Sequence, residues 1–239
     1  MPATIINVFL ILLGGALGLR FKGLISSGLM SILTHALGLC VLIIGVNSAA
    51  GTQDMLCVIV CMVAGTVIGH AVDIERRLEG LGDFLRAKLI RGNGSGRFTE
   101  GFMNASLLYC VGAMAITGSI EAGLNHNYEI IVSKGVIDGV TSISFAATMG
   151  VGVLFSTVPV LIYQGGITLL AGWVGTYLPD AVITEMTAVG GLLIIALAVN
   201  VLELGKTKIK VGNMLPAMFL PIVYIPLAEW VGTVFANLL

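Results

Sequence analysis

The 239-residue chain is 57% hydrophobic and only 10% charged, with a formal net charge of −1. Soluble domains have about 45–50% apolar and about 25% charged residues, so this composition excludes a soluble globular protein of this size. The balanced charge also gives no electrostatic basis for binding a nucleic acid.

Eight segments are apolar enough to span a bilayer, which requires about 20 mostly apolar residues in a helix. In chain order they are residues 4–20, 28–49, 55–72, 101–120, 134–156, 158–176, 181–203 and 211–235. Pro159 predicts a tight boundary between the fifth and sixth segments. Pro216, Pro221 and Pro226 predict a kink or a break in the eighth. We therefore expect an all-α integral membrane protein with about eight transmembrane helices.

The basic residues predict how these segments are oriented, because Lys and Arg concentrate in cytoplasmic loops. They cluster after the first and third segments and between the seventh and eighth. Placing these clusters in the cytoplasm leaves only Lys134, of the 12 basic residues, on the outer side. The sequence thus predicts a multi-pass protein with its N-terminus outside.

Two stretches of the chain match each other at one constant offset. Thr34, Gly38, Leu39, Val46 and Asn47 correspond to Thr187, Gly191, Leu192, Val199 and Asn200. Ser27 and Asp180 hold equivalent positions and are predicted as N-caps. In the predicted topology the two copies cross in opposite directions, as in transporters with inverted repeats. We expect spans one to three to form one three-helix repeat and spans six to eight to form the other.

The chain accordingly divides into four parts. They are a first membrane repeat (1–72), a cytoplasmic amphipathic helix with a Gly-rich linker (73–98), two inserted spans (99–157) and a second, inverted repeat (158–239). In the cytoplasmic part, Ile74, Leu78, Leu81, Leu85 and Leu89 fall on one helical face. Such a helix is expected to lie on the inner leaflet.

Glycines are expected to pack the spans closely. Gly14 and Gly18, and likewise Gly65 and Gly69, have the small-xxx-small spacing that allows helix backbones to approach each other in lipid.

Polar residues inside the spans are the candidate pathway residues, because ionisable groups are costly there. Asp138 and Glu185 lie near the outer starts of the fifth and seventh spans, at a depth similar to Asn7 and Asn47. These four groups predict a cation-attracting vestibule or a proton-coupled site. A simpler role stays open for both acids, since Asp138 can pair with Lys134 and acids early in a helix favour its dipole.

A second polar layer is expected nearer the cytoplasm. It consists of Asn104, Gln164, Asn200 and His70. Taken singly, Asn and Gln are more often ordinary hydrogen-bonding residues between helices.

The sequence gives no support for an enzyme. It contains no G-x-S-x-G, H-E-x-x-H or P-loop motif. Cys40, Cys57, Cys61 and Cys110 lie in apolar runs, which favours packing over metal or disulfide formation. We expect no catalytic residues, no cofactor and no metal site.

Five motifs resemble the bacterial YqgA/YdfK family of multi-spanning membrane proteins. They are DIERRLE (73–79), GFMNASLLYCVGAMAITGSI (101–120), YQGGITLL (163–170), EMTAVGG (185–191) and IKVGNMLP (209–216). The resemblance extends over essentially the whole chain. It implies a bacterial cytoplasmic (inner) membrane, a domain of unknown function and a speculative transport role, and it assigns no site residues.

The favoured function is a transporter or channel for a small ion or solute, with cations slightly favoured by the outer acids. The expected pathway residues are Glu185, Asp138, Asn47, Asn200, Asn104 and Gln164. The chain is small for an alternating-access transporter, so a homodimer or larger homo-oligomer in the lipid bilayer is expected. Two alternatives stay open: a non-transporting scaffold or accessory subunit and, less favoured, an intramembrane lipid-processing enzyme.

Overall fold

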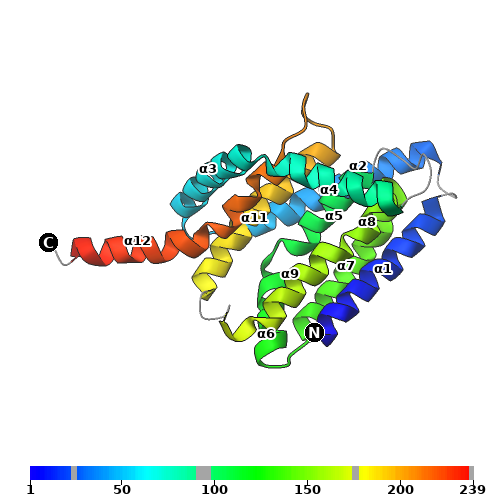
Figure 1. Ribbon diagram of the computed structural model, residues 1–239. Helices are drawn as coiled ribbons and strands as arrows, with labels where there is room; N and C mark the ends of the chain where they lie inside the picture. The colour runs from blue at the N-terminus through cyan, green and yellow to red at the C-terminus, as the bar shows by residue number, and fades with distance from the viewer. Residues whose placement is uncertain (23–25, 90–97, 174–177, 237–239) are drawn as a thin grey trace.

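The computed structural model describes residues 1–22, 26–89, 98–173 and 178–236. Within these ranges every regular element is a helix (Figure 1). In chain order the helices are α1 (Pro2–Lys22), α2 (Ser27–Ala49), α3 (Met55–Val72), α4 (Ile74–Leu89), α5 (Phe98–Cys110), α6 (Ala113–Leu124), α7 (Glu129–Met149), α8 (Gly152–Phe155), α9 (Thr157–Leu169), α11 (Asp180–Val201), the 3₁₀-helix η1 (Val211–Phe219) and α12 (Pro221–Ala236).

The predicted all-α membrane fold is confirmed. Six candidate spans among the described residues are long and apolar enough to cross a membrane, and two bent helix pairs raise the number to as many as eight. The inverted repeat stays a prediction.

Helices α1 and α7 run side by side and parallel (Figure 1). They touch through glycine. A Cβ atom at Gly14 would collide with the carbonyl of Gly139, and one at Gly18 with the carbonyl of Ile143. The predicted small-residue face of α1 therefore packs directly on the backbone of α7, as expected where lipid supplies no hydrophobic drive between helices.

Helices α2 and α11 form a second close, antiparallel pair. A Cβ at Gly38 would meet the Leu202 side chain, and one at Gly191 would meet the backbone of Ala49. The two glycines that correspond in the sequence repeat thus each face the opposite helix. Similarly, Gly65 and Gly69 of α3 pack against η1.

Two spans are broken. The axis bends by 59° between α5 and α6, where Gly112 has φ 123°, a backbone conformation that favours glycine. The axis bends by 42° between η1 and α12, at Pro221. The predicted break in the eighth segment is confirmed, whereas the sequence analysis missed the break in the fourth.

Several predicted boundaries are wrong. The fifth and sixth spans separate at Gly150, where φ is 88°, and not at Pro159. Pro159 lies in the first turn of α9, where proline is tolerated because its missing N–H has no helical partner. The N-caps are Ser26 and Pro179, one residue before the predicted Ser27 and Asp180.

Helix α4 docks on η1 through one carboxylate. The Gly212 N–H donates to Glu75 Oε2 at 2.6 Å, and the Glu75 N–H donates to Asn213 Oδ1 at 2.8 Å. Burial raises the pKa of the Glu75 carboxyl. The side chains of Leu81, Leu85 and Leu89 and the linker at 92–96 lie outside the residues described, so the amphipathic face stays a prediction.

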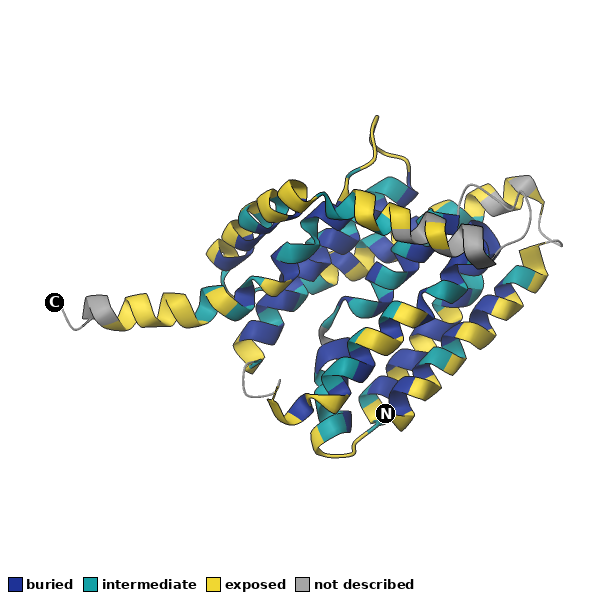
Figure 2. Ribbon diagram, in the orientation of Figure 1, coloured by how far each residue is buried: buried dark blue, intermediate teal, exposed yellow. Residues whose placement is uncertain are grey.

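The buried core centres on α11, whereas α3 and α12 lie at the periphery (Figure 2). Helix α12 extends away from the other helices toward the C-terminus (Figures 1 and 2). It carries large exposed apolar side chains, among them Val223, Leu227 and Trp230.

Candidate functional site

One face of α7 carries a buried polar stripe. Lys134, Asp138 and Ser142 recur every fourth residue, so they share a helical face, and they are 5%, 6% and 0% exposed. Lys134 Nζ and Asp138 Oδ2 form an ion pair. One turn deeper, the Ser142 hydroxyl lies 2.8 Å from the hydroxyl of Tyr109 on α5.

Two amides from other helices complete this site. Asn7 of α1 donates through Nδ2 to Asp138 Oδ2 at 3.2 Å and to Gln164 Oε1 of α9 at 2.9 Å. Gly135 allows the approach, since a Cβ there would lie 3.1 Å from the Asn7 Cα. We call Lys134, Asp138, Asn7 and Gln164 the buried polar cluster.

The buried polar cluster contains unpaired polar atoms. Asn7 Oδ1 and Gln164 Nε2 are buried without a hydrogen-bond partner, as are the hydroxyls of Thr4 on α1 and Thr168 on α9. Buried polar groups are normally paired, because an unpaired one costs about 1–3 kcal/mol. Each of these groups requires an explanation, such as a bound water or ion or a functional role.

The ion pair borders a cavity of about 270 Å³. The cavity lies beside the break between α5 and α6, where Gly112 lines it. Its remaining polar lining comes from Ser48 of α2, Thr141 of α7 and Thr187 of α11, and its other walls are apolar.

A second cavity of about 210 Å³ lies at the other end of α5, next to α4. Asn104 of α5 and Asn200 of α11 line it together with charged residues, which are Glu75, Glu79, Glu100 and Lys208. The two cavities therefore lie along the same two helices, α5 and α11.

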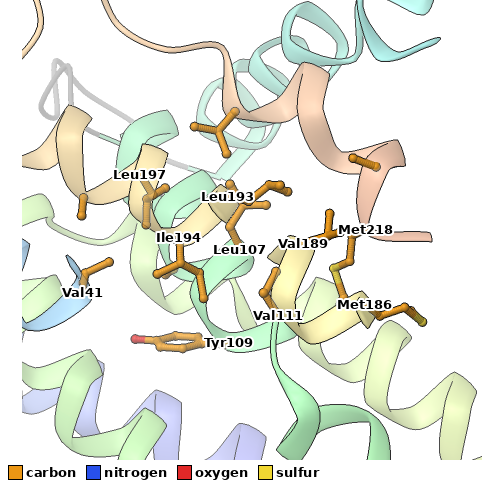
Figure 3. Packing of buried hydrophobic residues seen from close by; sticks show 14 of the residues in the cluster. Val41, Leu107, Tyr109, Val111, Met186, Val189, Leu193, Ile194, Leu197 and Met218 are labelled. Atoms are coloured by element: carbon orange, nitrogen blue, oxygen red, sulfur yellow. The ribbon is translucent and has the colours of Figure 1, made fainter. Parts of the chain in front are cut away.

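An apolar layer separates these cavities. Figure 3 shows its side chains packed between α5 and α11, with Leu107 near Leu193 and Leu197, and Val111 near Val189. These residues are at most 8% exposed. Leu107 and Leu197 also line the second cavity and Val111 lines the first, so this layer lies between the two.

Glu185 lies at a different site from Asp138. Its carboxylate accepts from the Thr52 hydroxyl at 2.6 Å and from the N–H groups of Gln53 and Asp54 at 2.7 and 3.0 Å, so it holds the loop between α2 and α3. It borders a separate cavity of about 410 Å³ with Asp54, Asp180 and Glu229. Glu185 and Asp138 thus do not share one vestibule.

The predicted amide residues of the pathway also lie apart from one another. Gln164 bonds to Asn7 and so belongs with Asp138 rather than in the predicted inner layer; the reason is that its span begins at Gly152 instead of residue 158. Asn200 exchanges two 2.8 Å hydrogen bonds with the backbone of Ile209 and closes a loop. Asn104 donates to Met149 Sδ at 3.6 Å, and Asn47 is exposed.

The sequence analysis missed Tyr109 and Ser142 and treated Lys134 only as a partner of Asp138. The signal available for Lys134 and Ser142 was their spacing around Asp138. For metals, the described residues contain no group of three or more His, Cys, Asp or Glu side chains that could hold an ion.

Comparisons with known proteins give a family without an assigned activity. A family model described as "Protein of unknown function (DUF554)" matches residues 2–226. The chain is 31% identical over 231 residues to the "Uncharacterized membrane protein YdfK" of Bacillus subtilis (strain 168), with 94% of this chain and 96% of the relative covered. It is 25% identical over 222 residues to the "Uncharacterized protein YqgA" of Escherichia coli (strain K12), with 90% and 92% covered. No solved structure matches the chain.

Proposed function

We propose, from the premise that this chain belongs to the DUF554 family of proteins of unknown function, that it moves a small ion or solute across a bacterial cytoplasmic membrane. The path runs between α5 and α11, through the two cavities and the apolar layer that separates them. The N-terminus lies outside, so the cavity beside the ion pair opens toward the outer side.

The observation that carries this proposal is the Lys134–Asp138 pair beside a broken helix. Replacing a buried ion pair with packed apolar residues is often neutral or stabilising by about 1–4 kcal/mol, so stability alone does not explain the pair. Ionisable groups at membrane depth most often mark ion or substrate pathways. Discontinuous helices also mark binding sites in transporters, because the backbone groups freed at the break line a cavity.

The packed apolar layer supports a carrier over an open pore. A carrier must expose its site to one side at a time, and a site that opens to the outer side, with a packed apolar layer below it, fits the outward-facing state of such a carrier. The corresponding glycines Gly38 and Gly191, each facing the opposite helix, support the inverted repeat on which such carriers are built.

The test is flux through purified protein in liposomes that contain pH-sensitive and ion-sensitive dyes. Gradients of protons, sodium, potassium, chloride and pooled metabolites are applied in turn. We expect flux of at least one species, and we expect Asp138→Asn to reduce it about tenfold or more, the effect of losing about 1.4 kcal/mol.

The matched control is Lys206→Met, which removes the charge of an exposed lysine in the loop after α11 that lines neither cavity. It should leave the flux unchanged. Folding of each variant is checked by its melting curve and its elution profile in detergent. Silence of the folded, inserted wild-type protein across the whole panel, or full flux in Asp138→Asn, would reject the proposal.

One observation favours a second candidate, a non-transporting accessory subunit. Helix α12 extends away from the other helices, so its exposed apolar side chains are available to a spanning helix of a partner protein as well as to lipid. This candidate predicts that Asp138→Asn changes stability while no flux is found in any variant.

A further inference from the structure

We propose that the cavity beside the Lys134–Asp138 pair binds a small zwitterion, with one ammonium group and one carboxylate or phosphate group close together. The inference rests on the proposed transport function and names its cargo. It is carried by the placement of the two charges and of a helix N-terminus around one cavity.

Asp138 offers the site for the ammonium group. Among the described residues, both contacts of its carboxylate, with Lys134 Nζ and with Asn7 Nδ2, fall on Oδ2. Oδ1 takes part in neither contact, and Asp138 lines the cavity. A carboxylate has about four acceptor positions, so Oδ1 can accept hydrogen bonds from an ammonium group while Oδ2 keeps its partners.

Lys134 and α6 offer the site for the anionic group. An ammonium side chain has three donors, and the contact with Asp138 uses one of them. Helix α6 starts at the break with no side-chain cap, and Gly112, Met114 and Ala115 of its start line the same cavity. The N-terminus of a helix favours an anion, because its first N–H groups lack helical partners and its dipole is positive there.

The charge balance selects a zwitterion over a simple ion. Lys134 and Asp138 together carry no net charge, so a bound cation or anion would leave an uncompensated charge in a buried, low-dielectric place. Such a charge is strongly disfavoured. A zwitterion instead gives an alternating array of four charges with a net charge of zero.

The size and walls of the cavity fit a small metabolite. Its volume of about 270 Å³ is just below the range of about 300–1,000 Å³ typical of pockets for drug-sized ligands. Apolar walls from Ile44, Val111 and Ile194 suit a short aliphatic side chain, and the Ser48 and Thr187 hydroxyls can bond further polar atoms.

Two sources of this chemistry are distinguished by experiment. One is a free amino acid from water, and the other is the zwitterionic headgroup of phosphatidylethanolamine. The second is relevant because Ile44 and Ile137, which line the cavity, are 40% and 52% exposed, so an apolar rim faces the surroundings of the chain.

The first test compares three matched compounds on the wild-type protein. Alanine carries both charges, propionate lacks the ammonium group and ethylamine lacks the carboxylate. We expect alanine to bind in calorimetry and to exchange across liposomes, with the other two weaker by about tenfold or more. Equal binding of propionate or ethylamine would overturn the zwitterion assignment.

The lipid arm uses the same liposomes with a trace of fluorescent phosphatidylethanolamine or, as control, phosphatidylglycerol. Movement of phosphatidylethanolamine alone between leaflets, with alanine immobile, assigns the zwitterion to a lipid headgroup. If neither alanine nor phosphatidylethanolamine binds or moves, the zwitterion inference is wrong.

Variants connect either result to this cavity. Asp138→Asn and Lys134→Met should each abolish alanine binding, whereas Lys206→Met, at an exposed lysine that lines neither cavity, should leave it unchanged. Should either variant fail to fold, the three-compound comparison on the wild type still decides the matter. Asp138-dependent flux of sodium or chloride without alanine binding would reject the zwitterion inference and support the proposed transport function. Alanine binding without any flux would support the zwitterion inference and reject the transport function.

Discussion

At the scale of single residues, Asp138 and Glu185 are almost equally buried, yet their contacts differ in kind. Glu185 receives three hydrogen bonds, two of them from backbone N–H groups of one loop. Within the described part of the chain, the contacts of Asp138 are with side chains, and those side chains come from α1 and α7. A carboxylate fixed by backbone donors is suited to hold structure, whereas side chains can move with a ligand.

We therefore expect Glu185→Gln to lower stability and to leave transport intact. Hydrogen bonds to a charged acceptor contribute about 1.5–3 kcal/mol each, and the amide weakens all three. The measurement is the melting temperature in detergent, with flux normalised to folded protein. Glu229→Gln, an exposed acid at the same cavity, is the control and should melt like the wild type. A large loss of flux per folded molecule would instead put Glu185 on the pathway.

Asn200 and Asn47 correspond in the repeat but differ in their surroundings. Asn200→Ala removes both hydrogen bonds to Ile209, at a cost of about 1–3 kcal/mol if the peptide group stays buried and unpaired. We expect faster proteolysis of the loop after α11 in Asn200→Ala, and no change in Asn47→Ala. Equal proteolysis of the two variants would show that the loop does not depend on Asn200.

At the scale of helices, glycine packing between α1 and α7 makes a sharp prediction. Gly14→Ala places a methyl group against the Gly139 carbonyl, and overpacking of this kind typically costs about 1–3 kcal/mol. Gly166→Ala is the control, because nothing lies within 4 Å of the added Cβ. Thermal unfolding in detergent should separate the two variants, and equal melting would mean that the pair does not depend on this contact.

The sequence predicted the helices well because a run of about 20 apolar residues has few alternatives in lipid. It also predicted the Pro-rich break in the last span. It missed the break at Gly112 because glycine is common in these spans, and only a positive φ distinguishes a helix break from close packing. Pro159 was wrongly taken as the boundary between two spans, because a proline in the first turn of a helix does not interrupt it.

The candidate site could be predicted only in part. Asp138 was identified because an acid in an apolar run is rare, and Lys134 was identified as its partner through the four-residue spacing. The depth of Gln164 in the membrane could be predicted only from the start of its span. The apolar composition placed that start at residue 158, six residues after the observed start at Gly152. Contacts between Asn7 and Asp138 join residues 131 positions apart, and no local pattern encodes them.

At the scale of the whole molecule, α12 is the helix that extends away from the others. Its apolar side chains Val223, Leu227 and Trp230 are 64%, 55% and 64% exposed. We expect it to pack against a second copy of the chain. In a variant with the native cysteines replaced by alanine, Leu227→Cys should form a cross-linked dimer in membranes, whereas a cysteine at Lys206 should not. A chain that stays monomeric in both would contradict this dimer.

The parallel pair of α1 and α7 has a consequence for how the protein is made. Asn7 meets Asp138 only after 131 further residues have been synthesised, which takes roughly 7–26 s at about 5–20 residues per second. During that interval α1 sits in the bilayer with its glycine face and Asn7 unmatched. Insertion of this protein is therefore expected to depend on a factor that covers a nascent helix in the membrane. When that factor is depleted, chains truncated before α7 should be the first to be degraded.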